Sequence, residues 1–172
     1  MLSGETASGE FPIEAVTTMA KIAEEADLAQ VQNPSHEKIA RMRQNAIRRD
    51  QFGNPDAVAQ AACRTAEAIN ARRIVCFTRH GLNASLIARY RPTVPITAIT
   101  LTELAKHRCS LIWGVDALLS MEPVGTDALD RVIDETMMSN ALADEGDTGL
   151  IVGGVPLAMD TRANMMKLHT IG

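Results

Sequence analysis

Residues 73–100 read RIVCFTRHGLNASLIARYRPTVPITAIT, and this stretch decides the fold. Short apolar, β-branched runs open and close it, at 73–78 and 96–100, and such runs are typical of buried strands. Between them, residues 83–90 have a helical pattern that two prolines bring to an end. A strand, a helix and a second strand in this order predict one βαβ unit with parallel strands.

The same alternation continues along the chain. Apolar residues at helical spacing predict further helices at 55–69, 102–112 and 126–143, with Thr102 as a candidate N-cap. Further apolar runs predict strands at 114–120, 148–152 and 165–171. The expected fold is α/β, with three α/β/α layers around a mostly parallel five-stranded sheet whose last strand is antiparallel.

The N-terminal part has a different character. Small and turn-forming residues come first, and Pro12 then stands where a helix can begin. Apolar residues at helical spacing predict that this helix ends near Ala29. A polar segment with the basic run HEKIARMRQNAIRR follows, and we interpret it as a linker with a short helix whose charges face solvent. The predicted organisation is a loop and helix at 1–29, a linker at 30–54 and an α/β domain at 55–172.

Charge and composition restrict the partners. The net charge is −4, but it is −5 for residues 1–35, +7 for 36–91 and −6 for 92–172. The positive middle segment could attract an anion. Only 3% of the residues are aromatic, which disfavours single-stranded nucleic acid, and the negative total disfavours duplex DNA. A small phosphorylated ligand fits this pattern better.

Cysteine usage and hydropathy point to the cell interior. Cys63, Cys76 and Cys109 are odd in number and widely spaced, which predicts reduced structural thiols and no metal site. No run approaches the ~20 apolar residues of a membrane span. The N-terminus also lacks the charged and apolar regions of a signal peptide. We therefore expect a cytoplasmic protein with neither a membrane nor a nucleic acid as partner.

The loop after the first predicted strand is the first candidate site. Ligands of parallel sheets gather at the carboxyl ends of the strands. Here Thr78 supplies a hydroxyl, Arg79 a cation, His80 an imidazole and Gly81 a tight turn, a set suited to holding a phosphate. The alternative is an ordinary turn in which Asn83 caps the next helix.

The loop after the fourth predicted strand is the second candidate site. It reads GGVPLAMDTR from Gly153 to Arg162 and includes Gly154 and Thr161. Loops of this length often bind ligands, although many simply connect elements. Arg131, on the first turns of the helix before this strand, could converge on the same pocket, or it could form a surface ion pair.

Motifs of a self-contained active site are missing. The sequence has no zinc-ligand spacing, no G-x-x-x-x-G-K-[ST], no G-x-S-x-G and no paired carboxylates on a predicted pocket loop. His80 could act as a general base only with an oriented partner, and the sequence reveals none. An independent phosphate-handling enzyme is therefore the least favoured class of function.

The N-terminal residues carry a specific resemblance. The run MLSGETASGEFPIEAVTTMAKIAEEAD resembles the signature that ends the catalytic barrel of pyruvate kinases, where a strand runs into Ser-Gly-Glu-Thr-Ala and a helix follows. The remainder resembles the C-terminal domain of the same family. The matching motifs are Ala84 to Pro92, Pro95 to Thr100, Trp113 to Val115, Gly146-Asp147, Gly153 to Pro156, and Thr161 to His169.

This resemblance implies an enzyme that transfers a phosphoryl group from phosphoenolpyruvate to ADP with Mg²⁺ and K⁺. Ser3 and Glu5 would lie beside its active site, and the first helix would come from the end of a TIM barrel. Most catalytic residues would lie on barrel strands outside this chain, so we expect a fragment that is inactive alone and holds no cofactor.

The resemblance also implies a regulatory role for the C-terminal domain. In the family this domain binds a sugar phosphate or nucleotide effector through the loop that matches 78–83, assisted by the loop that matches 153–164, and it forms a tetramer interface. Arg131 matches a phosphate-binding arginine. His80 and Asn83 depart from the family, which has serine or glycine and serine or threonine there. We expect a regulatory and homo-oligomeric assembly domain. The alternative is a free-standing module that binds a phosphorylated ligand or a protein.

Overall fold

The computed structural model describes residues 2–32, 53–121, 126–155 and 162–172 of the chain. The chain divides into two compact units, Met1–Ile47 and Arg48–Gly172. The first is called the N-terminal unit below, and the second the α/β domain. No helix within the described ranges is long and apolar enough to cross a membrane.

Among its described residues, the N-terminal unit has two helices, α1 (Gly4–Ala7) and α2 (Pro12–Gln32). α2 begins at Pro12 as predicted, but it continues past the predicted end at Ala29. The sequence did not predict α1, a single turn in which the carbonyl of Ser3 accepts hydrogen bonds from the N–H groups of Thr6 and Ala7. Most of the predicted linker, including its short helix, lies outside the described residues.

The α/β domain is built on a five-stranded sheet with the order β3-β2-β1-β4-β5. Its strands are β1 (Ile74–Phe77), β2 (Ile96–Thr100), β3 (Val115–Leu119), β4 (Thr148–Gly153) and β5 (Met165–Thr170). The neighbours are parallel except for β4 and β5, which are antiparallel. The predicted fold class is therefore confirmed. β3 is less buried than a central strand because it lies at the edge of the sheet.

In the described part of this domain four helices accompany the strands, and their bounds differ slightly from those predicted. They are α4 (Gly53–Ala68), α5 (Leu82–Ala88), α6 (Glu103–Cys109) and α7 (Thr126–Ser139). Thr102 caps α6 as predicted, because its hydroxyl accepts a hydrogen bond from the Ala105 N–H at 3.2 Å.

α7 ends before the predicted Ala143 because its last turn forms a Schellman motif. The N–H of Ala141 donates to the carbonyl of Met138, and the N–H of Leu142 donates to that of Met137. Ala141 adopts the left-handed conformation, with φ at 54°. Glycine usually occupies this position, so an alanine there carries no stop signal in the sequence.

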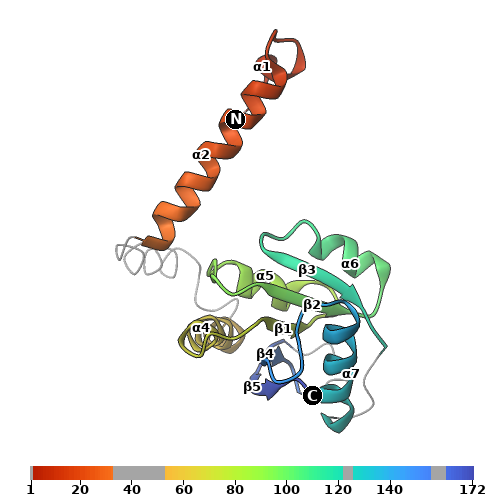
Figure 1. Ribbon diagram of the computed structural model, residues 1–172. Coiled ribbons are helices and arrows are strands. Elements are labelled where there is room, and N and C mark those ends of the chain that lie inside the picture. Colours follow the sequence, from red (N-terminus) through yellow and green to blue (C-terminus); the bar gives the residue numbers. More distant parts are fainter. Residues whose placement is uncertain (1, 33–52, 122–125, 156–161) are drawn as a thin grey trace. The chain divides into compact units, whose positions relative to one another are not determined.

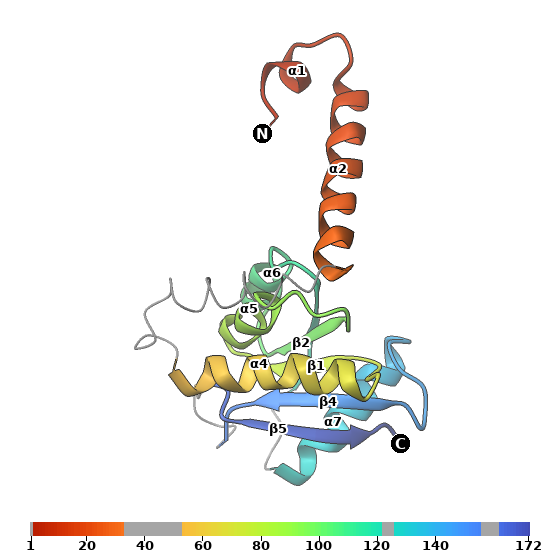
Figure 2. The ribbon, with the colours of Figure 1, turned by 90° about the vertical axis from the view of Figure 1, so that its left-hand side faces the viewer.

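The sheet separates two hydrophobic clusters, and this gives the domain its three layers. One cluster joins α4, α5 and α6 to the face of the sheet that presents Ile74, Cys76 and Leu150. The other joins α7 to the opposite face, which presents Val75, Ile99 and Ile151. Figure 1 shows all these helices around the sheet, and Figure 2 shows α4 in front of the sheet with α7 behind it.

Candidate functional site

The loop between β1 and α5 is shaped by a glycine at its closest approach to the core. Gly81 has a φ of 89°, in the left-handed region that favours glycine. A Cβ at this position would lie 3.3 Å from Sγ of the buried Cys109. The hydroxyl of Thr78 accepts a hydrogen bond from the Gly81 N–H at 3.0 Å, which closes the turn. The loop therefore has a fixed path beside the core.

The buried side chain of Asn83 holds this loop in place through two hydrogen bonds. Its Nδ2 donates to the carbonyl of Phe77 at 2.9 Å. Its Oδ1 accepts a hydrogen bond from the Ala163 N–H at 3.1 Å, which ties the loop to the segment that leads into β5. The alternative in which Asn83 caps α5 is wrong in this detail, because the N-cap is Gly81, which has no side chain to cap with.

Arg79 and His80 lie between these anchors, and both side chains are exposed. The loop thus presents a guanidinium and an imidazole on a backbone that three buried residues hold: Thr78, Gly81 and Asn83. A charged donor held on a fixed loop can bind an anion at a small cost in conformational entropy.

The second candidate loop leaves the sheet beside the first. Cys76 of β1 pairs with Val152 of β4, so the residues that follow these two strands emerge as neighbours at one edge of the sheet. Gly154 is buried at this edge, but Thr161 lies outside the described residues. The structure therefore places Gly154, a candidate residue of the second loop, at the same edge of the sheet as Thr78.

Asn164 closes the described ends of the second loop. Its side-chain Oδ1 accepts a hydrogen bond from the Val155 N–H, and its Nδ2 donates to the Val155 carbonyl, both at 2.9 Å. Its own N–H donates to the Gly153 carbonyl at 3.0 Å. Sequence reasoning did not assign Asn164 this role, although the family-like run from Thr161 to His169 contains it.

Arg131 lies on a third element, the helix α7. α7 runs alongside β5, with Asp130 paired to Lys167 and Asp134 to His169. β5 begins at Met165, opposite the last residue of β4, so the N-terminal turns of α7 lie toward the edge that carries both loops. Arg131 is on these turns, exposed, with Nε at 3.6 Å from Oε1 of Glu135. The structure shows no contact between Arg131 and the described loop residues.

The cysteines cannot supply a reactive thiolate. All three are free and buried. Burial raises the pKa of Cys63 to about 12. Burial also raises the pKa of Cys76, with a smaller contribution from the nearby Cys109. Burial also raises the pKa of Cys109. Thiols of this kind stay protonated at neutral pH and act as small apolar side chains.

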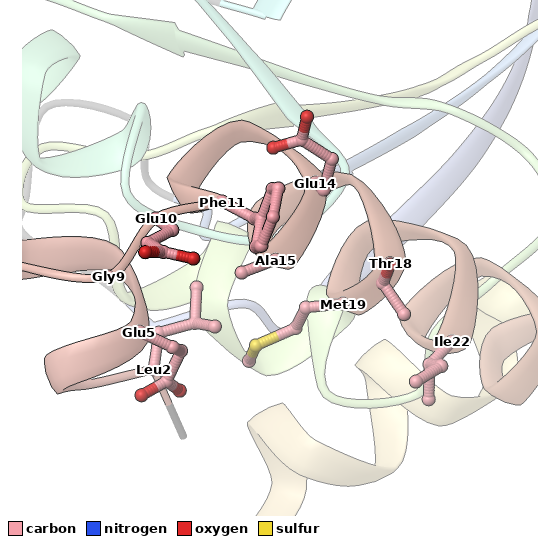
Figure 3. Close-up of a pocket in the computed structure, with 10 residues that line it drawn as sticks. All are labelled: Leu2, Glu5, Gly9, Glu10, Phe11, Glu14, Ala15, Thr18, Met19 and Ile22. Atoms are coloured by element: carbon pink, nitrogen blue, oxygen red, sulfur yellow. The ribbon is translucent and has the colours of Figure 1, made fainter.

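The N-terminal unit has a groove of its own between α1 and α2, with a volume of about 660 Å³. Apolar side chains of α2 and of the residues just before each helix line it together with three carboxylates, as Figure 3 shows. The lining residues are Leu2, Glu5, Gly9, Glu10, Phe11, Glu14, Ala15, Thr18, Met19 and Ile22. Glu5, which the resemblance places beside an active site, is therefore part of this groove. Ser3 is exposed at the start of α1, where its carbonyl forms the first turn.

Comparison with known proteins agrees with this architecture. The family model described as "Pyruvate kinase, alpha/beta domain" matches residues 56–169. The pyruvate kinase of Sporosarcina psychrophila is 34% identical over 173 residues, and that of Staphylococcus aureus strain USA300 is 35% identical over 172 residues. Each alignment covers 100% of this chain and 28% of the relative, so the chain spans just over a quarter of the length of these enzymes. From the domain match and from alignments that cover the whole of this chain, we conclude that the chain belongs to the pyruvate kinase family and contains its C-terminal α/β domain.

Proposed function

We propose that this chain is the regulatory and assembly part of a pyruvate kinase, and that the edge formed by the two loops binds a phosphorylated small molecule. The loop from Thr78 to Asn83 is the observation that carries the proposal. Its exposed Arg79 and His80 sit on a backbone fixed by buried hydrogen bonds. Sugar phosphates and nucleotides both present the dianionic group that such donors recognise.

Regulation through this site needs two global states that the ligand binds unequally. The ligand would bridge loops that follow β1 and β4, and Asn83 already joins the first of them to the start of β5. Binding would therefore bias the packing of these elements, and this packing would bias the contacts of the domain with the rest of the enzyme.

The proposal includes the N-terminal unit as the connection to a catalytic barrel. Three large apolar side chains of this unit are more exposed than is usual in the core of a folded domain: Phe11 (64%), Ile13 (77%) and Ile22 (65%). A barrel would cover them. The parent enzyme would transfer a phosphoryl group from phosphoenolpyruvate to ADP, with Ser3 and Glu5 beside its active site.

Mg²⁺ and K⁺ would belong to that parent reaction. The described residues do not group three His, Cys, Asp or Glu side chains around a point where a metal ion could sit. A cytoplasmic location is part of the proposal, and three free, buried cysteines are in keeping with it.

The binding proposal is tested by a thermal-shift titration with fructose 1,6-bisphosphate, ribose 5-phosphate, AMP, ATP and inorganic phosphate. A ligand that binds only the folded chain raises Tm in a saturable way. Substitution Arg79→Ala is expected to weaken this binding about tenfold, because it removes a charge-assisted hydrogen bond. The matched control is Arg64→Ala, which removes an exposed arginine of α4. Absence of a shift with all five compounds, or equal affinities of Arg79→Ala and wild type, would contradict the proposal.

The assembly proposal rests on the edge strand β5. Lys167 and His169 face α7, so Met166 and Leu168 point to the opposite face, where they are 43% and 54% exposed. An edge strand with exposed apolar residues is a suitable surface for a second copy. We expect light scattering after size exclusion to show an oligomer for the wild type, which Leu168→Glu dissociates. Leu104→Glu, on the exposed side of α6, should leave assembly unchanged. A monomeric wild type, or an oligomer that survives Leu168→Glu, would refute this part.

A further inference from the structure

Four titratable residues join α7 to β5 in two rungs. Lys167 Nζ donates to both carboxylate oxygens of Asp130, at 2.8 and 2.6 Å. His169 Nε2 lies 2.6 Å from Oδ1 of Asp134, and its Nδ1 lies 3.8 Å from Oδ1 of Asp130. We call these four residues the α7–β5 ladder. The His169 and Asp134 side chains are each only 11% exposed, so solvent and salt screen their interaction less than that of a surface pair.

The spacing of the two rungs fixes the helix along the strand. Asp130 and Asp134 are one helical turn apart, which corresponds to a rise of about 6 Å along the axis. Lys167 and His169 are two residues apart on a strand, which corresponds to about 7 Å. The two distances match, so both rungs form together only in one register. A shift of α7 by one turn would break both rungs and could form at most one new pair, so it would lose at least one of the two interactions.

The apolar contacts of α7 do not supply the same constraint. Leu129, Ile133 and Met137 pack against the sheet, but apolar packing has no preferred direction and permits sliding and rotation more easily than paired hydrogen bonds do. α7 is also the only helix in the described part of the chain that contributes to this second hydrophobic cluster. The ladder is therefore the directional attachment of α7 to the sheet.

Arg131 follows directly after the first ladder residue on α7. The strand side of the ladder is β5. The segment that leads into β5 contains Ala163, which is hydrogen-bonded to Asn83 of the loop that begins at Thr78. We propose that the α7–β5 ladder positions Arg131 relative to this loop, so that both bind one phosphate ester, and that its four members are positioning residues of this site. This inference rests on the binding function proposed above.

The first test uses Asp134→Leu, because positioning and simple electrostatics predict opposite results. Removal of a carboxylate raises the local positive potential and, by that effect alone, would tighten the binding of an anion. Loss of the rung should instead weaken binding about threefold to tenfold. The probe is fructose 1,6-bisphosphate, or ribose 5-phosphate where it gives the larger melting shift. Affinity is measured by calorimetry on the full chain, far below the Tm of each variant, so that a loss of stability alone does not change it.

The second test breaks the other rung with Lys167→Met and compares it with Arg72→Met. Arg72 pairs with Asp147 at 3.4 Å, and the partners are 56% and 34% exposed, against 44% and 35% for Lys167 and Asp130. Both variants remove one positive charge from a half-exposed ion pair, but only Lys167 contacts α7. Lys167→Met should weaken the probe about threefold or more, Arg72→Met by less than about twofold, and Lys167→Arg should restore wild-type affinity.

The outcomes separate this inference from the proposed function. Unchanged or tighter binding by Asp134→Leu, with Arg79→Ala still defective, would overturn the role of the ladder and leave the binding site intact. A wild type that binds neither probe would overturn the site and the ladder together. Weaker binding by both ladder variants, with normal binding by Arg72→Met, would support the inference.

Discussion

Replacement of Asn83 by alanine is expected to lower the free energy of unfolding of the α/β domain by about 2–3 kcal/mol. The substitution removes two hydrogen bonds, one to the Phe77 carbonyl at 2.9 Å and one from the Ala163 N–H at 3.1 Å. The Ala163 N–H is buried and would lose its partner, and an orphaned buried donor costs more than a bond that water can replace. Urea denaturation followed through Trp113, the single tryptophan, measures the change.

Asn140→Ala is the matched control for this prediction. Asn140 is exposed, and its side-chain Nδ2 donates to the Thr136 carbonyl at 2.8 Å, so water can replace what alanine removes. We expect a loss below about 1 kcal/mol for Asn140→Ala. Equal losses for the two variants would show that Asn83 is not a buried brace.

The brace also changes how Asn83 relates to the proposed ligand. The resemblance assigns the position to direct phosphate contact, but both polar atoms of this side chain already have protein partners. Asn83 therefore supports the loop, while the side chains of Arg79 and His80 are exposed. A family member with serine or threonine at this position would hold the same loop differently.

The fold could be predicted because its signals are local. β2 runs from Ile96 to Thr100, the predicted strand, since a fully buried strand appears in sequence as an unbroken apolar and β-branched run. α2 begins at Pro12 for an equally local reason. Helix ends are less predictable, because Asn70 and Ala141 stop α4 and α7 in left-handed conformations without a glycine.

The candidate site was only partly predictable, because its key contacts join distant segments. The loop residues Thr78 and Gly81 follow a predicted strand, so their place at the sheet edge was predictable. The partner of Asn83, in contrast, is 80 residues away, and that of Asp130 is 37 residues away. Sequence patterns report periodicity over one element, so they reveal that Asp130 is charged but not that Lys167 faces it.

Ile133→Ala is expected to have the largest effect on stability, about 3–4 kcal/mol. Ile133 is completely buried at the centre of α7, within the cluster that includes Val75, Ile99 and Ile151 of the sheet. Alanine would remove three carbon atoms and leave a cavity between α7 and the sheet. In the described residues no second helix contributes to this cluster, so a neighbouring helix cannot move in to fill the space.

Met138→Ala on the same helix is the control, because Met138 is 44% exposed and should cost less than about 1 kcal/mol. A comparison of Ile133→Ala with Asp134→Leu also separates the apolar attachment of α7 from its directional attachment by the ladder. Ile133→Ala should weaken the attachment of α7 while both rungs can still form, so its affinity for a phosphate ester, measured where the domain is fully folded, should change less than that of Asp134→Leu. A loss of affinity in Ile133→Ala as large as in Asp134→Leu would mean that packing alone positions Arg131. A loss of stability below about 1 kcal/mol would mean that α7 is not packed on the sheet as described.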